Sequence, residues 1–283
     1  MIVFPNCKIN LGLNIVHKRS DGYHDLETVL YPLPLCDALE VVQLTRSDQS
    51  NIGDHSVGQL STSGETINGS PTENLCVKAY SQLKSKFPQI PLVRMHLHKS
   101  IPPGSGLGGG SADGAFTLQL LNDNFQLGLT IERLLDYALL LGSDCPFFII
   151  NKPCFATGRG EFLERVTVDL SAYKIVIVAP PIHIRTSEAF SSVKPARPSR
   201  SIKEIIKEPV ETWAQSLKND FEESVFNKYP EIRNIKNQLY KGGAIYSSLT
   251  GSGSAVYGIF DKDHGLNLSF GAKYFLKELI SEQ

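Results

Sequence analysis

A run of glycines between a strand-like segment and a helix-like segment constrains this chain more than any other feature. Five glycines stand within residues 104–110. Before them, residues 93–98 alternate apolar and polar side chains as a half-buried strand does, and after them residues 112–121 are mostly apolar and predict a helix. Glycine has no Cβ atom, so a polyphosphate can approach the backbone N–H groups, and a helix beginning near Ser111 directs its N–H groups and positive dipole end to the same place. The pattern predicts a phosphate-binding turn, because a flexible linker seldom joins a strand to an apolar helix.

Other glycine-rich motifs fit this turn less well. Residues 104–109 match the G-x-G-x-x-G dinucleotide fingerprint, but that motif needs a strand directly before it and a second strand after its helix. Here two prolines at residues 102–103 separate the strand from the turn, and residues 130–141 predict a second helix instead. A Walker A loop would place a lysine where Gly110 stands, and the H-R-D and D-F-G motifs of protein kinases do not occur in the sequence.

The rest of the chain mixes strand and helix patterns, which predicts an α/β or α+β protein, and its 283 residues suit two domains. We expect strands over residues 38–44, 93–98, 147–150 and 174–179, helices over residues 74–83, 112–121 and 130–141, a helix with Ile232, Ile235 and Leu239 on one face, and a hairpin formed by residues 245–249 and 256–260. Ser201 and Glu204 predict a capping box, residues 49–71 a loop or irregular hairpin, and residues 194–200 a surface connection.

Composition excludes several classes of partner. The formal net charge is −1, so no overall basic field would recruit nucleic acid or an anionic membrane. The five cysteines are odd in number and lack C-x-x-C spacing, which predicts reduced thiols in a cytoplasmic protein. No apolar run approaches the roughly 20 residues that span a bilayer, and the first residues are too soon interrupted to form a signal peptide. We expect a small-molecule substrate, no nucleic acid or membrane, and a monomer or weak homodimer.

Three separated segments carry a resemblance to a known family. Residues 102–111 resemble the second motif of the GHMP kinases (galactokinase, homoserine, mevalonate and phosphomevalonate kinases), residues 5–14 the first and residues 247–257 the third. The resemblance implies an α+β, two-domain GHMP kinase fold with the active site in the cleft between the domains. Residues 1–155 would form the ATP-binding domain and residues 156–283 the substrate-side domain.

The resemblance also implies ATP as phosphoryl donor. ATP would be bound by the glycine turn and by two residues on the adenosine side, namely Pro102, Pro103, Gly104, Ser105, Gly106, Leu107, Gly108, Gly109, Gly110, Ser111, Lys99 and Asn74. Mg²⁺ would be held mainly through the phosphates, with Ser111 and water, since no protein ligand set is evident. Asp113 would repel the phosphates unless it points away or serves the metal.

Three further segments, residues 8–11, 19–26 and 141–148, indicate the acceptor. They resemble the branch of the family that transfers the ATP γ-phosphoryl group to the 2-hydroxyl of a cytidine-diphosphate-linked methylerythritol, in the non-mevalonate route to isoprenoids. Asp144 would be the base, and Lys8 its electrostatic partner on the transferring phosphoryl group. Without the resemblance, Asp144 reads as a loop or cap residue and Lys8 as an edge-strand charge.

The same branch implies the contacts to the acceptor. Tyr23 would stack on the cytosine, His24 would read its edge, and Phe190 would be the second aromatic, reached through Thr186. Asn10 would contact the substrate or order the lysine. The substrate-side residues are therefore Asn10, Tyr23, His24, Thr186, Phe190, Thr250 and Gly251.

Two alternatives remain open at this point. Another small-molecule kinase of the family, of the homoserine or mevalonate type, would have no reason to keep Tyr23 and His24. A non-catalytic nucleotide-binding protein of the same fold would need neither Lys8 nor Asp144.

Overall fold

The computed structural model describes residues 1–45 and 59–280, which form two compact units, each assembled from separate segments of the chain. Unit 1 comprises Met1–Cys7, Leu35–Pro103 and Gly109–Asn151, and unit 2 comprises Lys8–Pro34, Gly104–Gly108 and Lys152–Gln283. Residues 8–34 and 104–108 thus pack with the C-terminal half of the chain. The assignment of ATP and substrate to residues 1–155 and 156–283 concerns binding and stays a prediction.

Unit 1 contains one four-stranded sheet. Its strands are β1 (Ile2–Val3), β4 (Ala38–Gln43), β6 (Val93–Lys99) and β5 (Gln59–Gly64), in the order β1-β4-β6-β5, with only the β5–β6 pair parallel among the described strands. The strands expected at residues 38–44 and 93–98 are confirmed. The alternation in β6 continues to Lys99, which is buried on the same side as Val93, Met95 and Leu97.

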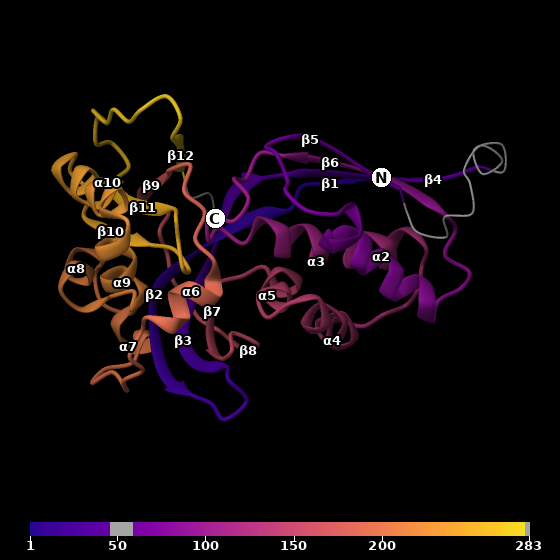
Figure 1. Ribbon diagram of the computed structural model, residues 1–283, viewed down its shortest axis with the longest axis horizontal. Helices are drawn as coiled ribbons and strands as arrows, with labels where there is room; N and C mark the ends of the chain where they lie inside the picture. Colours follow the sequence, from indigo (N-terminus) through magenta and orange to yellow (C-terminus); the bar gives the residue numbers. More distant parts are fainter. Residues whose placement is uncertain (46–58, 281–283) are drawn as a thin grey trace. The chain divides into compact units, whose positions relative to one another are not determined.

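Helices accompany this sheet. They are the 3₁₀ helix η1 (Pro71–Glu73) and the α-helices α2 (Leu75–Lys86), α3 (Gly109–Asn124), α4 (Ile131–Leu141) and α5 (Cys145–Ile150). Figure 1 shows α2 and α3 running along the sheet of unit 1. Asn74 caps α2, Thr130 caps α4, and Gly142 ends α4, so the helices expected over residues 74–83 and 130–141 are confirmed.

Three expectations in unit 1 need correction. Residues 147–150 form part of helix α5 and not a strand, because a short apolar run has no periodicity that separates the two, and Pro146 favours a helix start. Residues 49–71 are not all loop: Gln59–Gly64 pairs with β6, while residues 46–58 lie outside the described residues. Helix α3 begins at Gly109, before Ser111.

Unit 2 contains two four-stranded sheets. One has the order β2-β3-β7-β8, with β2 (Asn6–Lys18), β3 (His24–Cys36), β7 (Cys154–Gly158) and β8 (Phe162–Arg165). The other is antiparallel with the order β10-β11-β9-β12, formed by β9 (Tyr173–Ala179), β10 (Tyr246–Leu249), β11 (Val256–Asp261) and β12 (Phe275–Ile280). The expected strand at residues 174–179 and the expected final hairpin are confirmed.

The helices of unit 2 bury one apolar face each. They are α6 (Thr186–Ser191), α7 (Ile202–Ile205), the 3₁₀ helix η2 (Val210–Thr212), α8 (Trp213–Ser216), α9 (Phe221–Lys228) and α10 (Pro230–Lys241). As expected, Ile232, Ile235 and Leu239 of α10 face the core, where they join Val176 and Phe260 of the antiparallel sheet. Ser201 caps the short α7 by accepting from the N–H of Lys203.

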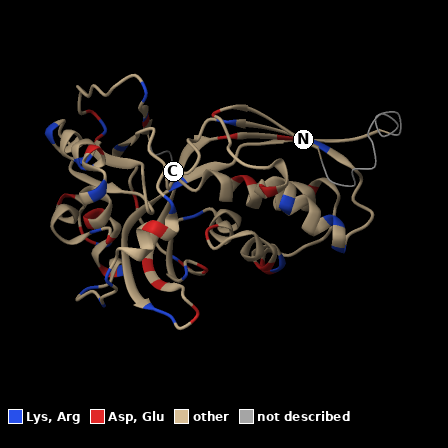
Figure 2. Ribbon diagram, in the orientation of Figure 1, with Lys and Arg blue, Asp and Glu red and all other residues tan. Residues whose placement is uncertain are grey.

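Charged residues are dispersed over the described chain. Figure 2 shows basic and acidic residues interspersed along the elements of both units, in keeping with the balanced composition. Among the described residues, no helix has both the length and the apolar character required to cross a bilayer.

Candidate active site

The first half of the glycine turn is shaped by packing within unit 2. Gly104, Gly106 and Gly108 have φ values of 70°, 85° and 77°, a left-handed conformation that favours glycine. A Cβ atom at Gly106 would overlap the carbonyl oxygen of Thr250, and one at Gly104 would overlap the ring of His183. These glycines therefore let the turn fold closely against its own unit.

The second half of the turn forms the first residues of α3 in unit 1. At Gly109 a Cβ atom would lie 2.9 Å from Ile101 Cγ2 and 3.2 Å from Lys99 Nζ, so packing explains that glycine too. At Gly110 nothing lies within 4 Å of the Cβ position. The missing side chain of Gly110 is thus not explained by packing, and it leaves room at a helix N-terminus, where an anion is stabilised. This geometry fits a bound phosphate.

Lys8 lies in a buried polar network of unit 2. Its side chain is 3% exposed, and its ammonium donates to Asn10 Oδ1 at 2.7 Å and to the carbonyl oxygen of Gly106 at 2.8 Å. Its backbone N–H donates to the carbonyl oxygen of Leu107 at 2.9 Å. The start of β2 is thereby fixed to the glycine turn.

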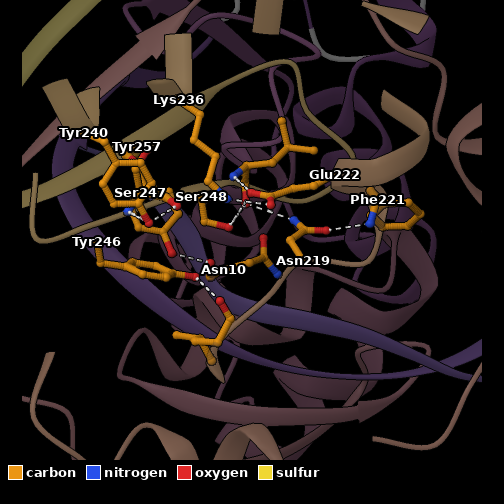
Figure 3. Close-up of polar contacts among 12 residues, drawn as sticks. Asn10, Asn219, Phe221, Glu222, Lys236, Tyr240, Tyr246, Ser247, Ser248 and Tyr257 are labelled. Atoms are coloured by element: carbon orange, nitrogen blue, oxygen red, sulfur yellow. Dashed lines mark hydrogen bonds and ion pairs between the residues drawn. The ribbon is translucent and has the colours of Figure 1, made fainter. Parts of the chain in front are cut away.

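Asn10 connects this lysine to the hairpin turn after β10. Asn10 Oδ1 accepts from the backbone N–H of Gly251 at 2.9 Å and from Thr250 Oγ1 at 3.2 Å, and its carbonyl accepts from the Tyr257 hydroxyl at 2.8 Å. Figure 3 shows Asn10 and Tyr257 in this network together with Asn219, whose Nδ2 donates to the carbonyl oxygen of Gly251 at 2.9 Å. Three segments that are distant in sequence therefore meet around one ammonium group.

Aromatic residues of unit 2 gather at the start of β3. The rings of His24 and Phe190 stack with centroids 5.0 Å apart, and burial, helped by Lys18, lowers the pKa of His24. Tyr23 is 54% exposed, with the Arg159 guanidinium 4.5 Å from its ring centroid. Flat, partly exposed rings of this kind suit a planar ligand such as a nucleobase.

In unit 1, Asp144 stands directly before α5 and is half-buried. Ser111, in the first turn of α3, lies close to the thiol of Cys145, the residue that follows Asp144. Burial raises the pKa of that thiol to about 12, so Cys145 stays protonated. Ser111 and Asp144 thus lie at neighbouring helix starts.

Comparison with known proteins assigns the chain to a family. Residues 74–152 match the GHMP kinases N terminal domain model, and residues 201–270 match the GHMP kinases C terminal model. The chain belongs to the GHMP kinase family. This GHMP kinase is similar over 263 residues, at 52% identity and 93% coverage of both chains, to a Bacteroides fragilis protein named 4-diphosphocytidyl-2-C-methyl-D-erythritol kinase.

Two solved structures resemble this GHMP kinase. A crystal structure of 4-(cytidine 5′-diphospho)-2C-methyl-D-erythritol kinase matches all of both chains with a TM-score of 0.79 and 26% identity. The mevalonate kinase of Methanococcus jannaschii matches 100% of this chain and 98% of its own, with a TM-score of 0.67 and 12% identity, which shows the shared fold alone. The predicted family and α+β fold are confirmed, and membership implies the use of ATP.

Two residues expected near adenosine have structural partners in this GHMP kinase. The Lys99 ammonium pairs with the carboxylates of Asp37 and Asp113, the latter at 2.8 Å, and is 3% exposed. Although burial lowers it, these carboxylates raise the pKa of Lys99 above its usual value. The Asn74 side chain accepts from the backbone N–H of Cys76 at 2.9 Å and caps α2. Their predicted contact with adenosine stays a prediction.

Asp113 was expected to repel the phosphates unless its side chain pointed away or served the metal. Its carboxylate points toward the buried Lys99 ammonium, with which it pairs at 2.8 Å. Burial raises its pKa to about 7, and Lys99 opposes part of that rise. Among the described residues of the GHMP kinase, no group of three or more His, Cys, Asp or Glu side chains is arranged to hold a metal ion.

Sequence reasoning missed two residues that contact the predicted site. Asn219 holds Gly251 from outside the third motif, and Arg159 covers one face of Tyr23 from the turn between β7 and β8. Neither stands in a local pattern that marks it, because both contacts join residues far apart in the chain of this GHMP kinase.

Proposed function

We propose that this GHMP kinase transfers the γ-phosphoryl group of ATP to the 2-hydroxyl of 4-diphosphocytidyl-2-C-methyl-D-erythritol, giving the 2-phosphate and ADP in non-mevalonate isoprenoid synthesis. The observation that carries the choice of acceptor is the 52% identity, over 93% of both chains, with a relative named for that substrate. The exposed ring of Tyr23 and the stacked pair His24–Phe190 are consistent with a cytosine ligand.

The donor site would be the glycine turn. ATP supplies an electrophilic γ-phosphoryl group when it is bound. The open position at Gly110 and the N–H groups of the first turn of α3 would hold phosphate oxygens, with the Ser111 hydroxyl beside them. Mg²⁺ would be required and held mainly through the phosphates, with Ser111 and water completing its shell. Asn74 and Lys99 would contact adenosine, and since the Lys99 ammonium is engaged by carboxylates, its contact would come from its backbone.

Two residues would carry the chemistry. The Asp144 carboxylate would accept the proton of the 2-hydroxyl group, which is a poor nucleophile while protonated. The Lys8 ammonium would stabilise negative charge on the phosphoryl group as it moves. Its hydrogen bonds to Asn10 Oδ1 and to the carbonyl oxygen of Gly106 would help to hold it in place for that role.

The acceptor would be held mainly by unit 2. Tyr23 and Phe190 would stack on the cytosine and His24 would hydrogen-bond its edge, with Thr186 at the start of α6 beside them. Asn10, Thr250 and Gly251 would lie closer to the reacting hydroxyl. We also infer a cytoplasmic enzyme that is a monomer or weak homodimer.

A coupled assay tests the proposal. The protein is incubated with ATP, Mg²⁺ and the cytidyl substrate, and ADP release is followed, with mevalonate and homoserine as control acceptors. We expect ADP release that depends on the cytidyl compound alone. Release with mevalonate or homoserine, or none with the cytidyl compound, would overturn the assignment.

The role of Asp144 has its own test. The Asp144→Asn variant keeps the shape of the side chain and removes the base, so turnover should fall by about 10²-fold or more. Full turnover by this variant would remove Asp144 from the mechanism while leaving the substrate assignment intact.

A further inference from the structure

We propose that Thr28 is a positioning residue that orients the amide of Asn10 and, through it, the ammonium of Lys8 for phosphoryl transfer; the inference rests on the proposed role of Lys8. Thr28 lies on β3, next to β2, which carries Lys8 and Asn10. It is 2% exposed and lies outside all the motifs that predicted the site.

The hydrogen bonds of Thr28 determine which way its proton points. Its hydroxyl donates to the carbonyl oxygen of Gly12 at 2.5 Å, and its oxygen accepts from Asn10 Nδ2 at 3.0 Å. A hydroxyl has one proton, and a carbonyl oxygen can only accept. The proton is therefore committed to Gly12, and the Thr28 oxygen presents only lone pairs to Asn10.

This commitment fixes the amide of Asn10. A side-chain amide has a donor end and an acceptor end that are interchangeable in shape. Since Thr28 can only accept, the NH₂ group of Asn10 faces Thr28, and the oxygen faces the ammonium of Lys8 and the N–H of Gly251. The reversed amide would place its NH₂ group against two donors.

These hydrogen bonds are buried, so the loss of one of them has a cost. Lys8, Asn10 and Thr28 are each at most 3% exposed, so no bulk water can replace a lost partner. A buried polar group without a partner costs about 1–3 kcal/mol. Loss of the Thr28 hydroxyl would leave the NH₂ group of Asn10 without its acceptor, so that the amide is held through its oxygen. The acceptor that holds Lys8 would then be fixed less firmly.

The chain offers well-matched variants. Thr28→Val removes the hydroxyl and keeps the shape, whereas Thr28→Ser keeps the hydroxyl and removes a methyl group. Thr117→Val is the control for loss of a buried threonine hydroxyl: Thr117 is 0% exposed, lies in α3 of unit 1, and donates to the carbonyl oxygen of Asp113 at 2.6 Å.

The test measures kcat and KM for both substrates, the melting temperature, and the NMR signal of the Asn10 side-chain amide in each variant. The amide signal is assigned by its loss in Asn10→Asp. We expect Thr28→Val to lower kcat by about tenfold or more with the KM for ATP changed by less than about threefold, to shift the amide signal and to speed its hydrogen exchange. In Thr28→Ser, kcat and the amide signal should both be close to those of the unsubstituted protein. Thr117→Val should leave kcat unchanged even if its melting temperature falls.

Distinct results would overturn the inference. An unchanged amide signal in Thr28→Val would contradict the orienting role, whatever the enzyme turns over. A changed amide signal with an unchanged kcat, or an equal loss of kcat in Thr117→Val, would reduce Thr28 to a structural residue. If the unsubstituted protein turned over no acceptor, the proposed function would fall and the positioning role with it. That outcome is recognisable because the difference in the amide signal between the Val and Ser variants would persist.

Discussion

Two lysines of this protein are equally buried and have different surroundings. Lys8 in unit 2 and Lys99 in unit 1 are both 3% exposed. Lys99 is paired with two carboxylates, those of Asp37 and Asp113. Lys8 donates to Asn10 Oδ1 and to the carbonyl oxygen of Gly106 in the glycine turn. The contacts of Lys99 join β6 to α3 and to the residue before β4 within unit 1, whereas those of Lys8 lie in segments that resemble family motifs. The difference indicates that Lys99 anchors the fold, and it is consistent with the proposed role of Lys8 in the chemistry.

The largest expected effect is a loss of activity when Lys8 is replaced. Lys8→Met removes the charge and keeps most of the volume, so kcat should fall by about 10³-fold because a donor to the transferring phosphoryl group is lost. Folding should be retained, since the partners of Lys8 include neutral oxygens that lose only a hydrogen bond. Steady-state kinetics and circular dichroism check both parts. A variant that kept its turnover would remove Lys8 from the chemistry.

The second prediction is a loss of stability when Lys99 is replaced. Lys99→Met leaves two buried carboxylates without their counter-charge, so the free energy of unfolding should fall by about 3–5 kcal/mol. Urea unfolding measures it. The control is Lys78→Met, which breaks the exposed pair with Glu73 at 2.6 Å and should change stability by about 0–1 kcal/mol. Equal effects of the two variants would show that the buried cluster is not an anchor.

The sequence carried part of this contrast. Alternation over residues 93–98 predicts a strand, and the structure continues that strand to Lys99, which is buried on the same side as Val93 and Leu97. What no local pattern revealed was the pair of carboxylates, because Asp37 lies 62 residues away in the chain. The helix caps Asn74 and Thr130 were predictable because capping is local.

The candidate site was predictable where motifs mark it and not elsewhere. Lys8 and Thr250 belong to segments that resemble family motifs, and the structure brings them to one network. Thr28 contacts Asn10, which lies 18 residues away in the chain, and Asn219 contacts Gly251, which lies 32 residues away. Neither Thr28 nor Asn219 stands in a recognisable pattern. The apolar run at residues 147–150 was wrongly predicted as a strand because four apolar residues fit a helix equally well.

A smaller effect is expected from two glycines of the turn, Gly106 beside Lys8 and Gly110 at the start of α3. Gly106→Ala would force a Cβ atom against the carbonyl oxygen of Thr250 at a φ of 85°, so the turn beside Lys8 must shift and stability should fall by about 1–3 kcal/mol. Gly110→Ala meets nothing within 4 Å and should keep stability, while the KM for ATP should rise because the methyl group occupies the space proposed for phosphate. Thermal unfolding and ATP titration separate the two. An unchanged KM for ATP in Gly110→Ala would move the phosphate site away from that residue.

The smallest expected effect concerns the proton balance of the Lys99 cluster. Burial raises the pKa of Asp113 from 3.8 to about 7, so between these values the folded protein binds a proton that the unfolded chain has released. The free energy of unfolding should therefore fall as pH rises through that window, and the loss should be complete above about pH 7. The other titratable groups facing Asp113 are Lys99 and Asp37, and Cys76 on α2. The raised pKa values of Lys99 and Cys76 keep both protonated over this range.

Asp113→Asn tests that balance directly. The amide cannot ionise, so Lys99 keeps Asp37 as a one-to-one partner at every pH. Urea midpoints at pH 5.5 to 8.5 should fall less steeply in the variant than in the unsubstituted protein, and at the alkaline end the variant should be the more stable of the two. Parallel profiles would show that Asp113 is ionised throughout. Lys99 would then lie between two permanent charges.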